Sequence, residues 1–133
     1  MGQPAATANS QVVGVDTHIV LVPTAGGPVP TPLPHPFSGI IQTGVVVTVK
    51  IGGQPVATRD SIAVNQPPHL PTPPGVSFQK PPSNQGTVAS QSSTVLAGGS
   101  GIARVGDQVK TCNDPADAPV AGIVGPVGTV LIG

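Results

Sequence analysis

Glycine and proline divide the chain into short apolar runs that are rich in β-branched residues. Valine and isoleucine together outnumber leucine 29 to 5, and β-branched side chains favour strands. No stretch free of both Gly and Pro exceeds 11 residues, and isolated helices shorter than about 12 residues are marginal. The pattern predicts an all-β fold. The expected strands span residues 11–22, 44–51, 55–64, 87–97, 101–111, 119–124 and 127–132.

Two proline-rich segments separate these strands. Residues 23–36 and 67–82 hold 13 of the 18 prolines. Because proline cannot donate a hydrogen bond to a central sheet ladder, we expect both segments to be ordered, polyproline-like excursions rather than sheet. Two glycine pairs, Gly52-Gly53 and Gly98-Gly99, are expected to provide positive-φ turns between strands.

A short unit occurs three times in the chain. It consists of a segment Thr-Val-x-Ile/Ala-Gly, a turn, and a segment Pro/Gly-apolar-Ala. The second segment is found at residues 4–10, 55–61 and 101–107, and the first at 129–133, 48–53 and 94–99. One unit is thus divided between the two ends of the chain, which predicts a closed ring rather than an open solenoid. Closure removes exposed strand edges, and three units predict pseudo-threefold symmetry in one polypeptide.

Charge and hydropathy exclude several classes of partner. Five Lys and Arg balance five Asp, and only 8% of residues are charged, so no basic patch is present to follow a nucleic-acid backbone. No apolar run reaches the length of a membrane helix, and the N-terminal residues show no Sec-type signal. If the protein leaves the cell, we expect another machine to export it. Asp114 and Asp117, each close to a proline, are expected to be turn residues.

The histidines and the cysteine are the chemically most informative residues. The chain contains only His18, His35, His69 and Cys112 of these types. His18 follows Pro4 by 14 positions, His69 follows Pro55 by 14, and Cys112 follows Gly101 by 11, counted from the first residue of the second segment of each unit. Equivalent positions converge on a threefold axis, and three imidazoles with one thiolate match a closed tetrahedral zinc site. We predict one structural Zn²⁺ on these four residues, although iron and nickel accept similar ligands.

A metal ion would also stabilise a fold whose hydrophobic core is small. The chain has two Phe and neither Trp nor Tyr, so its core lacks large aromatic side chains. Small domains are stable by only about 5–15 kcal/mol, whereas structural zinc sites in finger peptides contribute about 10–16 kcal/mol. We therefore expect the fold to loosen when the metal is removed.

The segment Pro4-Ala5-Ala6, the three units and the His/His/His/Cys set together resemble a PAAR-repeat protein, over nearly the whole chain. The chain has Thr7 where the family motif has Arg. The resemblance implies a small conical β structure with a zinc-stabilised tip, in which His18, His35, His69 and Cys112 are the ligands. It further implies a structural spike-tip protein of type VI secretion or a related contractile injection system. Such a protein caps a trimeric VgrG-like spike, with one copy per trimer and effectors as further partners.

The repeat and the resemblance together predict how the chain is used. The units fill residues 4–133, so we expect a single PAAR-repeat domain over residues 1–133 with no effector extension. It would assemble in the cytoplasm and leave the cell at the tip of the apparatus, meeting the target membrane only transiently. The Thr-Val-x strands are expected to face the spike, through Thr48, Val49, Ile51, Thr94, Val95, Thr129, Val130 and Ile132.

Two other functions fit parts of the sequence. In a small zinc hydrolase, three histidines would hold a metal with an open water site, or Asp16 and His18 would activate Cys112 as a nucleophile. A cysteine as fourth ligand closes that shell, and the chain has no Glu and no spare His as a base, so we expect no enzyme. In an extracellular adhesin or adaptor, residues 71–74 and 80–82 would be polyproline ligands.

Overall fold

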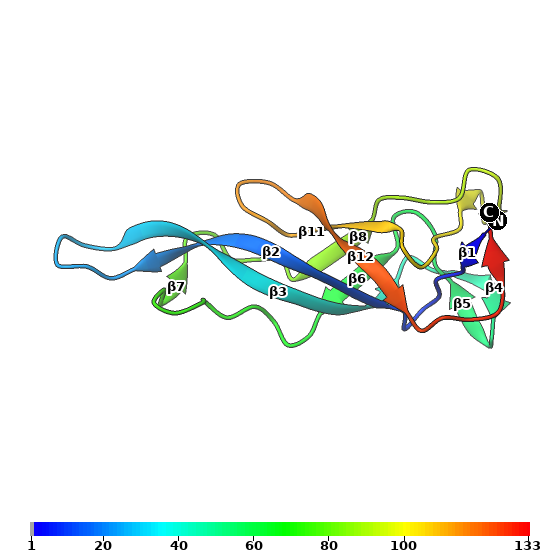
Figure 1. Cartoon of the computed structure of the whole chain (residues 1–133), viewed down its shortest axis with the longest axis horizontal. Coiled ribbons are helices and arrows are strands. Elements are labelled where there is room, and N and C mark those ends of the chain that lie inside the picture. The colour runs from blue at the N-terminus through cyan, green and yellow to red at the C-terminus, as the bar shows by residue number, and fades with distance from the viewer. Residues whose placement is uncertain (1) are drawn as a thin grey trace.

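The computed structural model describes residues 2–133, which form thirteen β-strands and no helix. The molecule is elongated (Figure 1). A long hairpin of β2 (Gln11–Val22) and β3 (Val29–Thr43) reaches to one end, and both chain termini lie at the other end, which we call the base. The predicted all-β class is confirmed.

The remaining strands are short. They are β1 (Gln3–Pro4), β4 (Val46–Ile51), β5 (Gln54–Val56), β6 (Ile62–Asn65), β7 (Ser77–Phe78), β8 (Gln85–Val88), β9 (Leu96–Ala97), β10 (Ser100–Gly101), β11 (Gln108–Thr111), β12 (Ala118–Gly125) and β13 (Leu131–Ile132).

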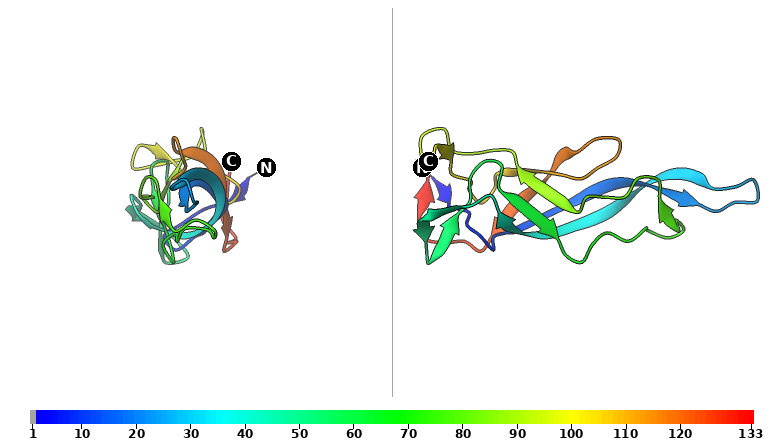
Figure 2. Two further views of the ribbon diagram at one scale, coloured as in Figure 1. Left: turned by 90° about the vertical axis from the view of Figure 1, so that its left-hand side faces the viewer. Right: turned by 180° about the vertical axis from the view of Figure 1, so that it is seen from behind.

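The main sheet closes on itself. Its strand order is β12-β11-β8-β6-β3-β2-β7, and β12 also pairs with β2. Six strands therefore form a ring, to which β7 is added along the outer part of β2. The view along the long axis shows this ring around its interior (Figure 2, left). Inside it, Phe37, Ile41 and Ile123 are the largest buried apolar side chains.

A second ring lies between the sheet and the base, and it is built from backbone alone. The N–H of Ala6 donates to the carbonyl of Ala103, that of Ala103 to Ala57, and that of Ala57 to Ala6, each over 2.9 Å. All three alanines are fully buried. These residues occupy the same position in the three units, so the predicted repeat is a true pseudo-threefold element of the structure.

Three two-stranded pairs follow at the base: β1–β13, β9–β10 and β4–β5. Their registers are equivalent, with Leu131 opposite Pro4, Leu96 opposite Gly101, and Lys50 opposite Pro55. These are the residues that the sequence alignment of the units brings together. The pair β1–β13 joins the two ends of the chain, as the divided unit predicts.

Each unit then turns sharply, and two of these turns interrupt predicted strands. The first residue of each turn donates its N–H to a side chain three positions later: Thr7 to Ser10, Thr58 to Ser61, and Arg104 to Asp107. Turns therefore interrupt the predicted strands 55–64 and 101–111. The predicted strand 87–97 is likewise broken, between β8 and β9.

The prediction for the first proline-rich segment was wrong. Residues 29–36 are not an excursion, because they belong to β3 and pair with β2 along its whole length. The second segment, 67–82, is irregular apart from β7.

The reason lies in the spacing of the prolines. In an antiparallel strand, the N–H and C=O of one residue point to the same side. The carbonyl of Pro34 accepts the Thr72 hydroxyl, and Ser38 bonds to residues 65 and 66, so even-numbered positions of β3 face away from β2. The prolines at 30, 32, 34 and 36 therefore lack only N–H groups that would face outward, and the ladder with β2 is preserved.

Candidate metal centre

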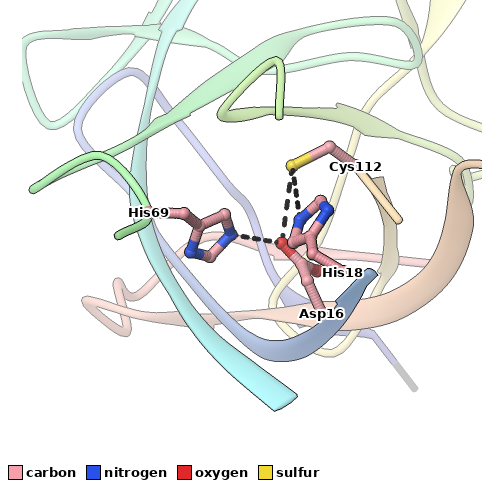
Figure 3. A group of neighbouring side chains, drawn as sticks. All are labelled: Asp16, His18, His69 and Cys112. Carbon is pink, nitrogen blue, oxygen red and sulfur yellow. Dashed lines mark hydrogen bonds and ion pairs between the residues drawn. The ribbon is translucent and has the colours of Figure 1, made fainter. Parts of the chain in front are cut away.

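Four buried ligand-bearing side chains meet inside the molecule: Asp16, His18, His69 and Cys112 (Figure 3). One ligand atom of each lies within 4.8 Å of all the others. The first two come from β2, His69 from the segment after β6, and Cys112 directly follows β11. The group therefore fastens together three separate parts of the chain.

Strand geometry explains why two of these residues come from β2. Successive side chains of a strand point to opposite faces, so residues two apart share one face. Asp16 and His18 are both buried on the inner face, whereas the neighbouring Val15 is exposed. Asp16 is directly opposite His35 of β3, which brings a third histidine to the same region.

The contacts within the group are short. Sγ of Cys112 lies 3.6 Å from Nε2 of His18 and 3.6 Å from Oδ2 of Asp16. The same Oδ2 atom lies 2.8 Å from Nε2 of His69, a charge-assisted hydrogen bond. All the facing atoms are thus strong metal ligands, and all are shielded from solvent.

The environment shifts the pKa values of the group. Burial lowers the pKa of His69, but its hydrogen bonds to Asp16 and Cys112 prevail and raise that pKa to about 9. Burial raises the pKa of Cys112, yet hydrogen bonds to His18 and His69 bring it down to about 7. The thiolate, which is the metal-binding form of cysteine, is therefore accessible near neutral pH.

Asp16 was not predicted as part of a metal group. Its side chain is fully buried and accepts hydrogen bonds from the Thr111 hydroxyl, from Nδ2 of Asn113 at 3.3 Å and from His69. The signal was present in the sequence as Asp16-Thr17-His18, because that spacing places both ligand types on one face of a strand.

His35 lies beside this group rather than within it. Its ring centroid is 5.4 Å from that of His18 and 5.6 Å from that of His69. Its Nδ1 lies 2.9 Å from the carbonyl of Leu33, and its Nε2 accepts the Thr72 N–H at 3.1 Å. Burial is the largest influence on the pKa of His35 and lowers it. Donation from Nδ1 leaves the lone pair on Nε2, which is the tautomer that a metal ligand requires.

Two of the distances match those around a single metal ion. Zn–N bonds of about 2.0–2.1 Å and a Zn–S bond of about 2.3 Å place tetrahedral N and S ligands about 3.6 Å apart, as found between His18 and Cys112. Imidazoles around one such ion have centroids about 5 Å apart, and those of His18 and His69 are 5.0 Å apart. The four-residue group can therefore hold one ion.

Aromatic rings enclose the group. Phe78 of β7 lies 5.7 Å from His18 and 5.3 Å from His35, measured between ring centroids. Phe37 lies 6.2 Å from His69, again measured between ring centroids. Both phenylalanines of the chain thus border the histidines, and an apolar surround of this kind excludes water from a metal site.

Comparison with known families agrees with this picture. The PAAR motif family matches residues 79–133, a range that includes Cys112 and the whole of the third unit. The resemblance is confirmed for that part of the chain. A PAAR motif implies a spike-tip protein of type VI secretion or a related contractile injection system, one that binds a VgrG spike. Proteins of this family are structural spike tips rather than enzymes.

No curated protein matches the chain significantly. Residues 2–133 contain no helix that is long and apolar enough to cross a membrane.

Proposed function

We propose that the protein is a spike tip that caps a trimeric VgrG-like spike, with its base on the spike and its hairpin pointing outward. The observation that carries this proposal is the threefold ring of Ala6, Ala57 and Ala103 next to the base. A single chain with three equivalent units can offer the same contact three times to a true trimer. The PAAR motif at residues 79–133 supports the same function independently.

The contact surface would be the three strand pairs of the base. Three residues in equivalent register, Lys50, Leu96 and Leu131, are exposed; the two leucines are 59% and 60% exposed. Exposed apolar side chains of this size are typical of docking surfaces. Of the predicted contact residues, Ile132 is buried in the base core, and Ile51 and Val95 pack against that core. The outward-facing positions beside them would therefore make most of the side-chain contact.

The metal would be one structural zinc ion. Four residues would hold it: His18, His35, His69 and Cys112. In this structure Nε2 of His35 accepts the Thr72 N–H, and zinc would replace that donor. Zinc would crosslink strands β2 and β3 to the segments that follow β6 and β11. Asp16 would balance the charge, because zinc with one thiolate keeps one positive charge and a buried charge needs a partner.

The remaining parts of the proposal follow from the motif. The protein would be assembled onto the spike in the cytoplasm and delivered with it, and it would meet the target membrane only briefly. Effector proteins would travel as separate partners. It would catalyse no reaction, so rigidity would be its contribution to penetration.

Native mass spectrometry of the purified protein, alone and mixed with a trimeric VgrG-type spike, tests this function. The expected masses correspond to one zinc ion per chain and to one chain per three spike subunits. Three chains per trimer would contradict the symmetry-matched cap. A failure to bind any trimeric VgrG-type spike would contradict the proposed function itself.

A further inference from the structure

One buried ring nitrogen lacks a hydrogen bond. Among the described residues, Nδ1 of His18 is fully enclosed and has no hydrogen-bond partner. The other ring nitrogen, Nε2, faces Cys112, so Nδ1 faces away from the ligand group. The nearest charged atom on that side is Oδ2 of Asp114, at 3.6 Å. The Asp114 side chain is only 4% exposed.

The backbone holds Asp114 against His18 from both sides. The N–H of Asp114 donates to the carbonyl of Thr17 over 2.8 Å, and its Oδ2 accepts the N–H of Ile19 at 2.9 Å. These two residues flank His18 in the sequence. The carboxylate therefore cannot leave the ring without breaking two bonds to β2.

The segment that carries Asp114 continues the edge of the sheet. Pairing of β12 with β2 ends at Gly14. Beyond that point, Oδ1 of Asn113 accepts the Thr17 N–H at 2.7 Å, and Asp114 makes the two bonds just described. Side chains of 113 and 114 thus take the place of a neighbouring strand along β2, next to the ligand Cys112.

We infer that Asp114 is a positioning residue for His18: when the metal binds, its carboxylate closes the 3.6 Å gap to Nδ1, accepts the Nδ1–H of that ring and so aims Nε2 at the metal. The inference rests on the proposed metal centre. Metal-bound histidines almost always donate their second ring N–H to a carboxylate or carbonyl, and this fixes both tautomer and orientation. Leu33 serves His35 in that way, and Asp114 would serve His18 once the metal is bound. Lys80 lies 3.8 Å from Oδ1 of Asp114, but its side chain is 62% exposed. An ion pair with an exposed partner contributes little to holding the carboxylate in place.

The test compares zinc binding by Asp114→Asn with that of the wild-type protein. Asparagine keeps an oxygen for the Ile19 N–H but removes the charge. Competition with a chromophoric chelator should show about 10- to 100-fold weaker zinc binding, the usual loss when such a partner is removed. Asp117→Asn is the matched control, because Asp117 is exposed in the same loop; it should bind zinc as the wild type does.

Nitrogen-15 NMR of the histidine rings adds a readout that a general loss of stability would not change. In the zinc-bound wild type, the Nδ1–H signal of His18 should be protected from exchange, and in Asp114→Asn it should be shifted and less protected. Unchanged zinc affinity in Asp114→Asn would overturn the inference. A wild-type Nδ1–H that exchanges as rapidly as an exposed imidazole would overturn it too, even if the variant fails to fold. A wild-type protein that binds no zinc would instead refute the metal centre itself.

Discussion

The backbone N–H of Ala6 donates to the carbonyl of Ala103 over 2.9 Å, which joins the first unit of the chain to the third. Ala57 completes the cycle, and none of the three side chains has access to solvent. All three methyl groups are packed in the main hydrophobic core. A larger side chain there must either push the three backbones apart or break a hydrogen bond.

We therefore expect Ala103→Val to lower the free energy of unfolding by about 1–3 kcal/mol, the usual cost of overfilling a packed core. Urea unfolding of the zinc-bound protein measures this. Ala116→Val is the control, since Ala116 is exposed and its substitution should change stability by less than about 0.5 kcal/mol. Equal stabilities of the two variants would show that the ring is loosely packed.

The repeat explains how much of the fold could be predicted. The alignment of Lys50 with Leu96 and Leu131 identified equivalent strand positions, because all three units bury the same face in the same register. The proline-rich hairpin could not be predicted in the same way. Whether a proline breaks a ladder depends on which side its missing N–H would face, and that depends on the strand's neighbours.

The prolines of β3 lead to the next prediction. Pro30 and Pro32 are exposed and stand where an N–H would face outward, so they remove the donors that another strand would use. The double variant Pro30→Thr, Pro32→Thr should keep the hairpin but self-associate at high concentration. Light scattering after size exclusion measures the mass. The matched control, Pro81→Thr with Pro82→Thr, alters a loop outside the sheet and should remain monomeric.

Replacement of the thiolate tests the contribution of the metal. Cys112→Ser should weaken zinc binding by more than about 100-fold, because loss of an orienting partner alone costs about 10- to 100-fold. It should also lower the free energy of unfolding by several kcal/mol, since zinc binding and folding are coupled. A chelator should destabilise the wild type to a similar extent and have little further effect on the variant. Unchanged thermal unfolding after complete removal of zinc would refute a structural role.

The sequence prediction and the geometry of the structure differ in the identity of the fourth metal ligand. The sequence favours His35, whereas the four-atom group contains Asp16. Cobalt substitution separates them, because its visible spectrum reports the number and type of ligands. If His35 is the ligand, His35→Gln should change the spectrum of the cobalt protein, and Asp16→Asn should retain the spectrum while weakening binding. The reverse result would make Asp16 the ligand and leave His35 outside the coordination shell.

The site was only partly predictable for a physical reason. Residue type and repeat register identified His18, His69 and Cys112, because each lies at a comparable distance along its unit. Asp16 and Asp114 carry no such register. Their role depends on hydrogen bonds across separate strands, to Thr111 and Asn113 for one and to Thr17 and Ile19 for the other. Contacts of this kind appear only once the strands are placed side by side.

The base provides the last prediction. Leu131 is 60% exposed in the register that it shares with Leu96 and Lys50, and a docked spike would remove this side chain from water. Leu131→Asp should therefore weaken binding to a trimeric VgrG-type spike by about 30-fold or more, the effect of losing about 2 kcal/mol at a central contact.

Leu70→Asp is the matched control. Leu70 is 79% exposed, but it lies beside His69, away from the base. Binding is measured on surface-immobilised spike. Unchanged zinc content in both variants would show that the metal site is intact. Weaker binding by Leu70→Asp with normal binding by Leu131→Asp would mean that the spike contacts the metal-bearing part of the molecule instead.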